Sequence, residues 1–267
     1  MDRQIYIRMA EVEDQHWWFA GRRTIVESLL TRFGLPQHAT ILEPGCGSGG
    51  NLRMLARCGS VYAMDLDDQA VQFAQSRGVG EVARGQLPDQ IPFGDRCFDS
   101  VVMTDVLEHL DDDSAALRAL RERLRPGGLL LLTVPAFRFL WSPHDVTHHH
   151  RRRYRADQLR KVVSEAGYEI CYLSYYNFVL FTPIFAARLI ERLTGVHSED
   201  RGLELPPRPL NWLLWKMFAA ERLLLGRVPL PLGVSLIVLA RNPVSRTQSG
   251  ERNVQTSAAE DRASAIA

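Results

Sequence analysis

The feature that most constrains the fold is a glycine-rich loop that follows a short apolar run. Residues 40–51 read TILEPGCGSGGN. Glycines at 45, 47 and 49 allow positive φ angles and carry no Cβ that would hold a ligand away from the backbone. The free N–H groups of the next helix point into the same space. The pattern therefore predicts a strand, a nucleotide-binding turn and a helix, with the loop cradling an adenosyl ligand.

Two acidic residues near this loop bear on the ligand: Asp65 indicates an adenosine ribose in either class of cofactor, and Glu43 helps to separate the classes. Gly45, Gly47 and Gly50 fit G-x-G-x-x-G, so their spacing alone does not separate a dinucleotide from S-adenosylmethionine. Glu43 at the loop entrance would repel a pyrophosphate, whereas it would attract the ammonium of a methionine moiety. Asp65 ends the next predicted strand, where it can accept both ribose hydroxyls. The alternative is a glycine turn that binds no ligand.

The loop is the first of several motifs in a fixed order. Residues 85–93 read GQLPDQIPF, residues 104–110 read TDVLEHL, and LRPGG at 124–128 precedes an apolar strand. With E-x-G-x-G-x-G at the loop, this order over residues 39–134 resembles the class I S-adenosylmethionine-dependent methyltransferases, of a small-molecule, type 11–12-like subgroup. The resemblance implies an α/β fold with a Rossmann-like, seven-stranded sheet whose last strand is antiparallel. It also implies S-adenosyl-L-methionine as cofactor and S-adenosyl-L-homocysteine as product.

The predicted cofactor-binding residues combine the loop, the strand ends and the start of the chain. They are Trp18, Arg22, Glu43, Gly45, Gly47, Gly49, Asp65, Leu66, Gln86, Leu87 and Asp105. Gln86 stands where the family carries an Asp that meets the adenine amino group, and its amide oxygen can accept the same hydrogen bond without a charge. Leu66 is expected against the adenine. Asp67 and Asp68 are expected to cap the next helix, and the resemblance implies a structural role for Asp99.

Residues 1–38 are predicted to form a helical segment that begins the chain. Its motif HWWFAGRR at 16–23 has three adjacent aromatic residues, which cannot share one helix face. One hypothesis is a lid, with Trp17 or Trp18 over the cofactor and Arg22 or Arg23 on a carboxylate. The alternative is that the aromatic residues pack the helix onto the core while the arginines are solvated.

The catalytic candidates follow the fourth and fifth predicted strands, because open parallel sheets bind ligands at the carboxyl ends of their strands. His109 is one candidate general base, and its alternative role is to line the cofactor pocket. His144, Asp145 and His150 are the others, since an imidazole oriented by a carboxylate deprotonates a hydroxyl efficiently. The region lacks the Asn-Pro-Pro-Tyr or Asp-Pro-Pro-Tyr tetrapeptide of many nucleobase methyltransferases, so we predict no nucleic-acid substrate.

We predict no metal site. The consecutive histidines at 148–150 point apart, and the neighbouring arginines repel a cation. Glu108 and His109 resemble part of a divalent-metal site in some quinone O-methyltransferases, but two adjacent residues do not define a site. The arginines at 151–153 and 155 are either a phosphate-binding group or a solvated basic turn. The string 141–154 resembles a bacterial methyltransferase subgroup often encoded among cell-surface glycan and lipid genes.

The domain prediction has a core interrupted by an insertion. Residues 1–38 form the N-terminal helical lid, 39–174 and 233–242 the methyltransferase core, 175–232 an inserted helical cap, and 243–267 a disordered tail. Residues 178–225 contain two largely apolar helices. The cap either buries these faces on the domain or in a homodimer, or rests on a membrane and admits a lipid-linked acceptor.

The composition limits the remaining choices. A net charge of +1 over 267 residues gives no global signature for nucleic acid or membrane. Scattered cysteines, a start without a secretory pattern and the lack of an apolar run of ~20 residues favour the cytoplasm, including the inner face of the membrane. We therefore predict methyl transfer to a small-molecule or lipid- or glycan-linked acceptor, at oxygen. The alternatives are a non-catalytic S-adenosylmethionine-binding module and an NAD-dependent oxidoreductase or epimerase.

Overall fold

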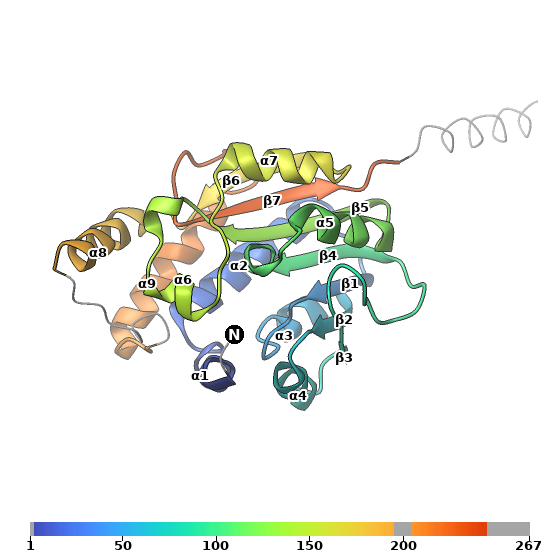
Figure 1. Cartoon of the computed structure of the whole chain (residues 1–267), viewed down its shortest axis with the longest axis horizontal. Helices are drawn as coiled ribbons and strands as arrows, with labels where there is room; N and C mark the ends of the chain where they lie inside the picture. Colours follow the sequence, from blue (N-terminus) through green and yellow to red (C-terminus); the bar gives the residue numbers. More distant parts are fainter. Residues whose placement is uncertain (1–2, 195–203, 245–267) are drawn as a thin grey trace, which may run out of the picture.

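The computed structural model describes residues 3–194 and 204–244 (Figure 1). The predicted disordered tail, from residue 245 onward, lies outside the described residues. The described helices are α1 Arg3–Val12, α2 Trp17–Arg32, α3 Leu52–Ala56, α4 Asp68–Ser76, α5 Asp113–Arg123, α6 Pro143–Thr147, α7 Ala156–Glu165, α8 Phe181–Thr194 and α9 Arg208–Ala220. The described residues also form the short 3₁₀ turns η1 Leu107–His109, η2 Arg138–Leu140 and η3 Glu221–Leu223.

A seven-stranded sheet forms the centre of the molecule. Its strands are β1 Ala39–Pro44, β2 Gly59–Asp65, β3 Glu81–Arg84, β4 Phe98–Thr104, β5 Leu124–Pro135, β6 Glu169–Tyr176 and β7 Ser235–Arg241. They are ordered β3-β2-β1-β4-β5-β7-β6, and β7 is antiparallel to both of its neighbours. Figure 1 shows β7 pointing in the opposite direction to β4 and β5. The predicted fold class is therefore confirmed.

Helices cover both faces of the sheet, which explains its nearly continuous apolar strands. Successive strand residues alternate between the two cores. Leu42 and Val101 pack on the side of α5 and α7, whereas Ile41 and Val102 pack on the side of α2 and α3. Because no face of the central strands meets water, the sheet holds the carboxyl ends of β1, β2 and β4 in a fixed relation to one another.

At the amino ends of the central strands, Asp99 holds the sheet together, which is the structural role predicted for it. Its carboxylate accepts hydrogen bonds from the backbone N–H and the hydroxyl of Thr40, both at 2.7 Å, and forms an ion pair with Arg125. These contacts join the starts of β1, β4 and β5. The fifth strand begins at Leu124 and includes the LRPGG motif, so it starts earlier than the predicted apolar strand at 129.

The segment between β6 and β7 contains α8, α9 and η3. Helix α9 packs against α2, where the buried ring of Phe218 stacks on Trp18 with 5.0 Å between centroids. Gly21 permits this approach, because a Cβ there would lie 2.4 Å from Phe218. Glu221 secures the start of the segment by accepting the backbone N–H groups of Asn177, Phe178 and Val179 at 2.7–3.1 Å. The insertion is thus joined to both the N-terminal helices and the sheet.

Candidate functional site

The glycine-rich loop has the predicted backbone conformation. Gly45, Gly47 and Gly49 have φ angles of +70°, +55° and +84°. A Cβ on Gly45 would lie 2.4 Å from Val106, whereas a Cβ on Gly47 would have no atom within 4 Å. The loop therefore packs tightly against the end of β4 at Gly45 and faces open space at Gly47, where a ligand can approach the backbone.

Asp65 lies at the end of β2, beside this loop. Its carboxylate is nearly buried and accepts the N–H of Gly47 at 2.8 Å and the N–H of Asp67 at 3.0 Å. Burial raises the pKa of Asp65. Because a carboxylate has about four acceptor positions, Asp65 can hold the loop and still accept a hydroxyl. Asp67 caps α4 through hydrogen bonds from Gln69 and Ala70, which confirms its predicted role.

Glu43 is fully enclosed at the end of β1. Asn51 donates its side-chain N–H to Glu43 Oε1 at 2.8 Å and to the hydroxyl of Thr104 at 3.1 Å. The other oxygen, Oε2, is buried without a hydrogen-bond partner. Burial raises the pKa of Glu43 to about 8. An ammonium group placed beside Oε2 would supply the missing partner, in line with the predicted role of Glu43.

The residues predicted to meet the adenine lie beyond β2 and β3. Leu66 is 53% exposed, Gln86 is exposed, and Leu87 is buried against the core. The N–H of Gly85 donates to the carbonyl of Asp65 at 2.9 Å, so this segment runs beside the end of β2. The exposed Leu66 and Gln86 leave surface for a planar ring, and their contact with adenine stays a prediction.

The N-terminal helices contact the glycine-rich loop through residues that the sequence analysis did not identify. Glu13, between α1 and α2, is buried and accepts the hydroxyl of Ser48 at 2.6 Å. Arg77 forms an ion pair with Glu13 and donates to the carbonyl of Ser48 at 2.6 Å. Glu13 and Ser48 are 35 positions apart, and neither residue carries a motif that would reveal the pairing.

Arg22 and Trp18 take different positions on α2. Arg22 is buried and forms an ion pair with Asp105, whose other oxygen accepts the hydroxyl of Thr133 at 3.0 Å. An arginine of the N-terminal segment thus meets a carboxylate, but that carboxylate belongs to the protein. Trp18 lies in an aromatic stack with Phe218 and Tyr176. The predicted contacts of Trp18, Arg22 and Asp105 with the cofactor stay predictions.

A second polar group lies at the end of β4, on η1. Glu108 is fully buried, and neither of its carboxylate oxygens has a hydrogen-bond partner. Burial, and then the nearby charge of Asp105, raise the pKa of Glu108 well above its usual range. Burial, and then the neighbouring His150, lower the pKa of His109 to about 4. His109 is therefore neutral near pH 7.

The loop after β5 brings Asp145 and His150 to the same place. Asp145 Oδ1 lies 2.8 Å from His150 Nδ1 and accepts Arg153 Nε at 2.7 Å, while Ser142 N–H donates to Oδ2 at 2.8 Å. Although burial raises the pKa of Asp145, the hydrogen bonds from His150 and Arg153 outweigh it and lower the pKa below its usual range. His144 lies on α6, outside the side chains that the structure describes.

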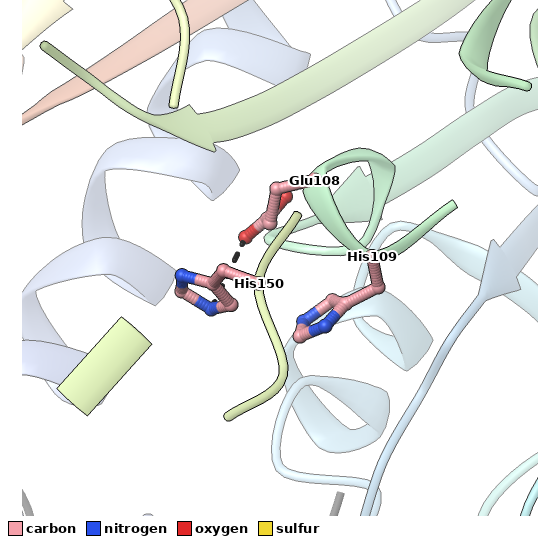
Figure 2. A group of neighbouring side chains, drawn as sticks. All are labelled: Glu108, His109 and His150. Carbon is pink, nitrogen blue, oxygen red and sulfur yellow. Dashed lines mark ion pairs between the residues drawn. The ribbon is translucent and has the colours of Figure 1, made fainter. Parts of the chain in front are cut away.

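Figure 2 shows how these groups meet. Glu108 and His109 extend from η1 and His150 extends from the loop that follows α6, so that the two imidazoles and the carboxylate converge. The rings of His109 and His150 are 4.8 Å apart between centroids, and His150 Nε2 is 3.9 Å from Glu108 Oε1. The structure therefore brings His150 to the adjacent pair Glu108 and His109, from which it is separated by about 40 positions in the sequence.

The arginines after His150 make contacts within the protein. Arg151 pairs with Asp111, and Arg152 pairs with Asp113 at 3.1 Å. Arg153 is almost fully buried against Asp145. Because these arginines are engaged by carboxylates of the chain, the structure favours neither a fully solvated basic turn nor a group reserved for a phosphate. They fix the loop that carries His150 onto the segment after β4.

The fold and the loop define a class of protein. A Rossmann-like sheet with a reversed seventh strand, a glycine-rich loop after β1 and an acidic residue at the end of β2 together form the class I methyltransferase architecture. A family model described as "Methyltransferase domain" matches residues 18–173, more than half of the chain. The chain belongs to this family.

Individual relatives agree with the family. A probable S-adenosylmethionine-dependent methyltransferase of Mycobacterium tuberculosis is 30% identical over 163 residues, covering 59% of this chain and 58% of that protein. A Haloferax volcanii methyltransferase solved with the Trm112 activator has a TM-score of 0.59 at 19% identity, covering 91% of this chain and 96% of that one. Haemonchus contortus phosphoethanolamine N-methyltransferase 2, solved with S-adenosyl-L-methionine, has a TM-score of 0.53 at 18% identity. The match covers 82% of this chain and 52% of that one.

These comparisons indicate S-adenosylmethionine as the cofactor of the family, while the two structures share only the fold. The chain spans 58% of the length of the mycobacterial relative that it matches. Among the described residues, no helix combines the length and the apolar character needed to cross a membrane. All four cysteines are among the described residues and carry free thiols.

Proposed function

We propose that the chain transfers the methyl group of S-adenosylmethionine to an oxygen of a small-molecule or lipid- or glycan-linked acceptor. The observation that carries this proposal is the Asp145–His150 pair beside Glu108, at the edge of the sheet that also holds the glycine-rich loop. Cofactor loop and polar group lie at the carboxyl ends of neighbouring parallel strands, the usual ligand site of such sheets.

The pair suits the removal of a proton from a hydroxyl. When His150 Nδ1 donates its hydrogen to Asp145, Nε2 is the unprotonated ring nitrogen, and it can act as the base that accepts the proton of the acceptor. The oxygen then attacks the sulfonium methyl carbon in line, the carbon–sulfur bond breaks, and S-adenosylhomocysteine leaves. His109, neutral because its pKa is lowered to about 4, lies beside this path. The transfer itself depends chiefly on positioning.

The insertion favours an acceptor with an apolar part. Helix α9 buries one face on α2, while other apolar residues of the insertion are exposed: Phe185, Leu189, Ile190, Leu193, Leu210, Trp212 and Leu213. Such a surface, with Lys216 over the rings of Trp212 and Trp215, fits the boundary of a lipid layer. We propose that this surface receives a lipid-linked acceptor at a membrane face.

The membrane contact is tested by sedimentation with anionic and neutral vesicles. Trp212→Ser with Leu213→Ser should reduce binding, whereas the matched exposed pair Leu223→Ser with Leu224→Ser, outside α8 and α9, should not. If neither the wild type nor the variants sediment with the vesicles, the proposed lipid surface is rejected. A concentration-dependent dimer that the first pair of substitutions abolishes would instead assign the surface to a homodimer.

The activity is tested by incubating the protein with methyl-labelled S-adenosylmethionine and an extract of the source cells. Label in an organic-soluble fraction would support a lipid-linked acceptor, and label in an aqueous fraction a soluble one. His150→Gln should remove most of the transfer while preserving cofactor affinity, and His149→Gln, the exposed neighbour, should have little effect. Cofactor binding without label in any fraction would indicate a non-catalytic binding module, and the absence of cofactor binding would refute the proposal.

A further inference from the structure

The convergence of Glu108, His109 and His150 raises the question of what occupies the space between them. Each side chain offers one ligand atom, and these atoms all lie within 4.8 Å of one another. Figure 2 shows the two rings and the carboxylate around a common space. Two imidazole nitrogens and one carboxylate oxygen form a donor set that first-row transition metals commonly use.

The carboxylate of Glu108 lacks a partner in its buried position. Both oxygens are buried without a hydrogen bond, and the side chain is completely enclosed. Asp105 lies nearby, but Arg22 and Thr133 already engage its two oxygens. An ionised carboxylate without a partner is costly in such a place, so either a proton or a cation must accompany Glu108.

The surroundings of His150 favour a cation. Its Nδ1 lies 2.8 Å from Asp145, which is held in turn by Arg153 and Ser142, so Nε2 is directed toward Glu108. A histidine that ligates a metal through one nitrogen typically donates the other N–H to a carboxylate. The 3.9 Å between Nε2 and Glu108 Oε1 is too long for a hydrogen bond, but an ion can bridge it.

The distances leave only a small adjustment for binding. With bonds of about 2.1 Å, two ligands of one ion lie at most about 4.2 Å apart. No two ligand atoms in the group lie more than 4.8 Å apart, so a small turn of a side chain closes the site. The main chain at His109 is already held, because Arg151 Nε donates to its carbonyl oxygen at 2.9 Å.

We propose that Glu108, His109 and His150 bind one divalent first-row transition ion, such as Zn²⁺, Mn²⁺ or Fe²⁺. Mg²⁺ and Ca²⁺ prefer sites made entirely of oxygen ligands, so two imidazoles select against them. This proposal replaces our expectation from the sequence that the chain has no metal site. Consecutive histidines do point apart, but only His150 of that run takes part, and its neighbouring arginines are neutralised by carboxylates.

The role of the ion rests on the proposed methyl transfer, whereas its binding does not. Three protein ligands leave positions that an acceptor hydroxyl can occupy. Coordination would lower the pKa of that hydroxyl, so that it would lose its proton to water; its oxygen would then bond to the methyl carbon as the carbon–sulfur bond breaks and S-adenosylhomocysteine leaves. With the ion bound, His150 Nε2 is a ligand. The ion then activates the acceptor oxygen, a role that His150 fills in the metal-free protein.

The test measures metal binding by the full chain after treatment with a chelator. Titration with Co²⁺ should reach one ion per chain, with visible absorption bands of a low-coordinate site, and Zn²⁺ should displace it. Glu108→Gln, His109→Gln and His150→Gln should each weaken the affinity by at least about 100-fold, more than the 10–100-fold typical of a residue that only supports a ligand. The matched control His149→Gln should bind as wild type does.

Two measurements keep failure of this site separate from failure of the proposed function. Circular dichroism and thermal unfolding show that each variant is folded, and calorimetry with S-adenosylmethionine on the metal-free protein reports the cofactor site alone. Stoichiometric Co²⁺ binding lost in the three variants but not in the control would support the site even if no methyl transfer is found. Lack of stoichiometric binding, or equal loss in His149→Gln, would overturn it.

Discussion

The open space above Gly47 yields a prediction that separates ligand contact from backbone strain. Gly47 and Gly94 have nearly equal φ angles of +55° and +58°, and a Cβ on either would have no atom within 4 Å. Gly94 lies before β4, at the edge of the sheet opposite the loop. Gly47→Ala should lower the affinity for S-adenosylmethionine at least about 10-fold, or about 1.4 kcal/mol, because the new methyl group occupies the ligand's space.

The two substitutions should have similar effects on stability. An alanine at positive φ costs about 1–2 kcal/mol, and the reduced entropy of the unfolded chain returns about 0.4–1 kcal/mol. Both variants should therefore lose roughly 1 kcal/mol of unfolding free energy. Gly45→Ala should lose about 1–3 kcal/mol more, because its Cβ would lie 2.4 Å from Val106.

The assay combines urea unfolding for stability with isothermal calorimetry for cofactor affinity. Gly94→Ala should keep the wild-type affinity and thereby isolate the backbone effect. If Gly47→Ala also binds normally, the ligand does not approach the loop at Gly47, and the assignment of the cofactor site is refuted. If Gly45→Ala is no less stable than Gly47→Ala, the packing of the loop on Val106 contributes less than the structure indicates.

Three other predictions concern buried charges. Arg22→Met should lower the free energy of unfolding by about 3–5 kcal/mol, because Asp105 is left without its ion pair. The double variant that also carries Asp105→Asn should recover part of that loss. If the losses of the two single variants simply add in urea unfolding, the pairing is contradicted. Burial raises the pKa of Glu43 from its usual 4.5 to about 8, so between these values the folded protein holds a proton that the unfolded chain lacks. The contribution of Glu43 to stability is therefore fully present at low pH and lost as the pH rises, by at most about 1.4 kcal/mol per pH unit. Glu43→Gln should remove this dependence of the unfolding free energy on pH. Identical pH profiles of stability for the wild type and the variant would refute the shift. Glu221→Gln should destabilise the protein by about 2 kcal/mol, because one amide oxygen replaces the carboxylate that accepts three backbone N–H groups. If the rate of hydrogen exchange at residues 177–179 is unchanged in this variant, Glu221 does not anchor that segment.

The sequence alone was sufficient for the fold and for the loop that is proposed to bind the cofactor. The conformation of the loop depends on local properties, namely glycines that tolerate positive φ and apolar strands of the buried parallel type. The position of Asp65 follows from its distance along the chain, since one strand, loop and helix bring the second strand back beside the first. Such features are readable because neighbours in sequence determine them.

The polar site required the tertiary structure, because its members are distant in sequence. His150 meets Glu108 across 42 positions, Arg22 meets Asp105 across 83, and Glu13 joins the glycine-rich loop. The sequence placed Asp105, Glu108 and His150 at the same edge of the sheet, but their partners depend on how the loop after β5 and the N-terminal helices fold onto that edge. Burial then decides their chemistry. A carboxylate or imidazole loses its water there, so its charge depends on the atoms packed around it, which only the tertiary structure supplies.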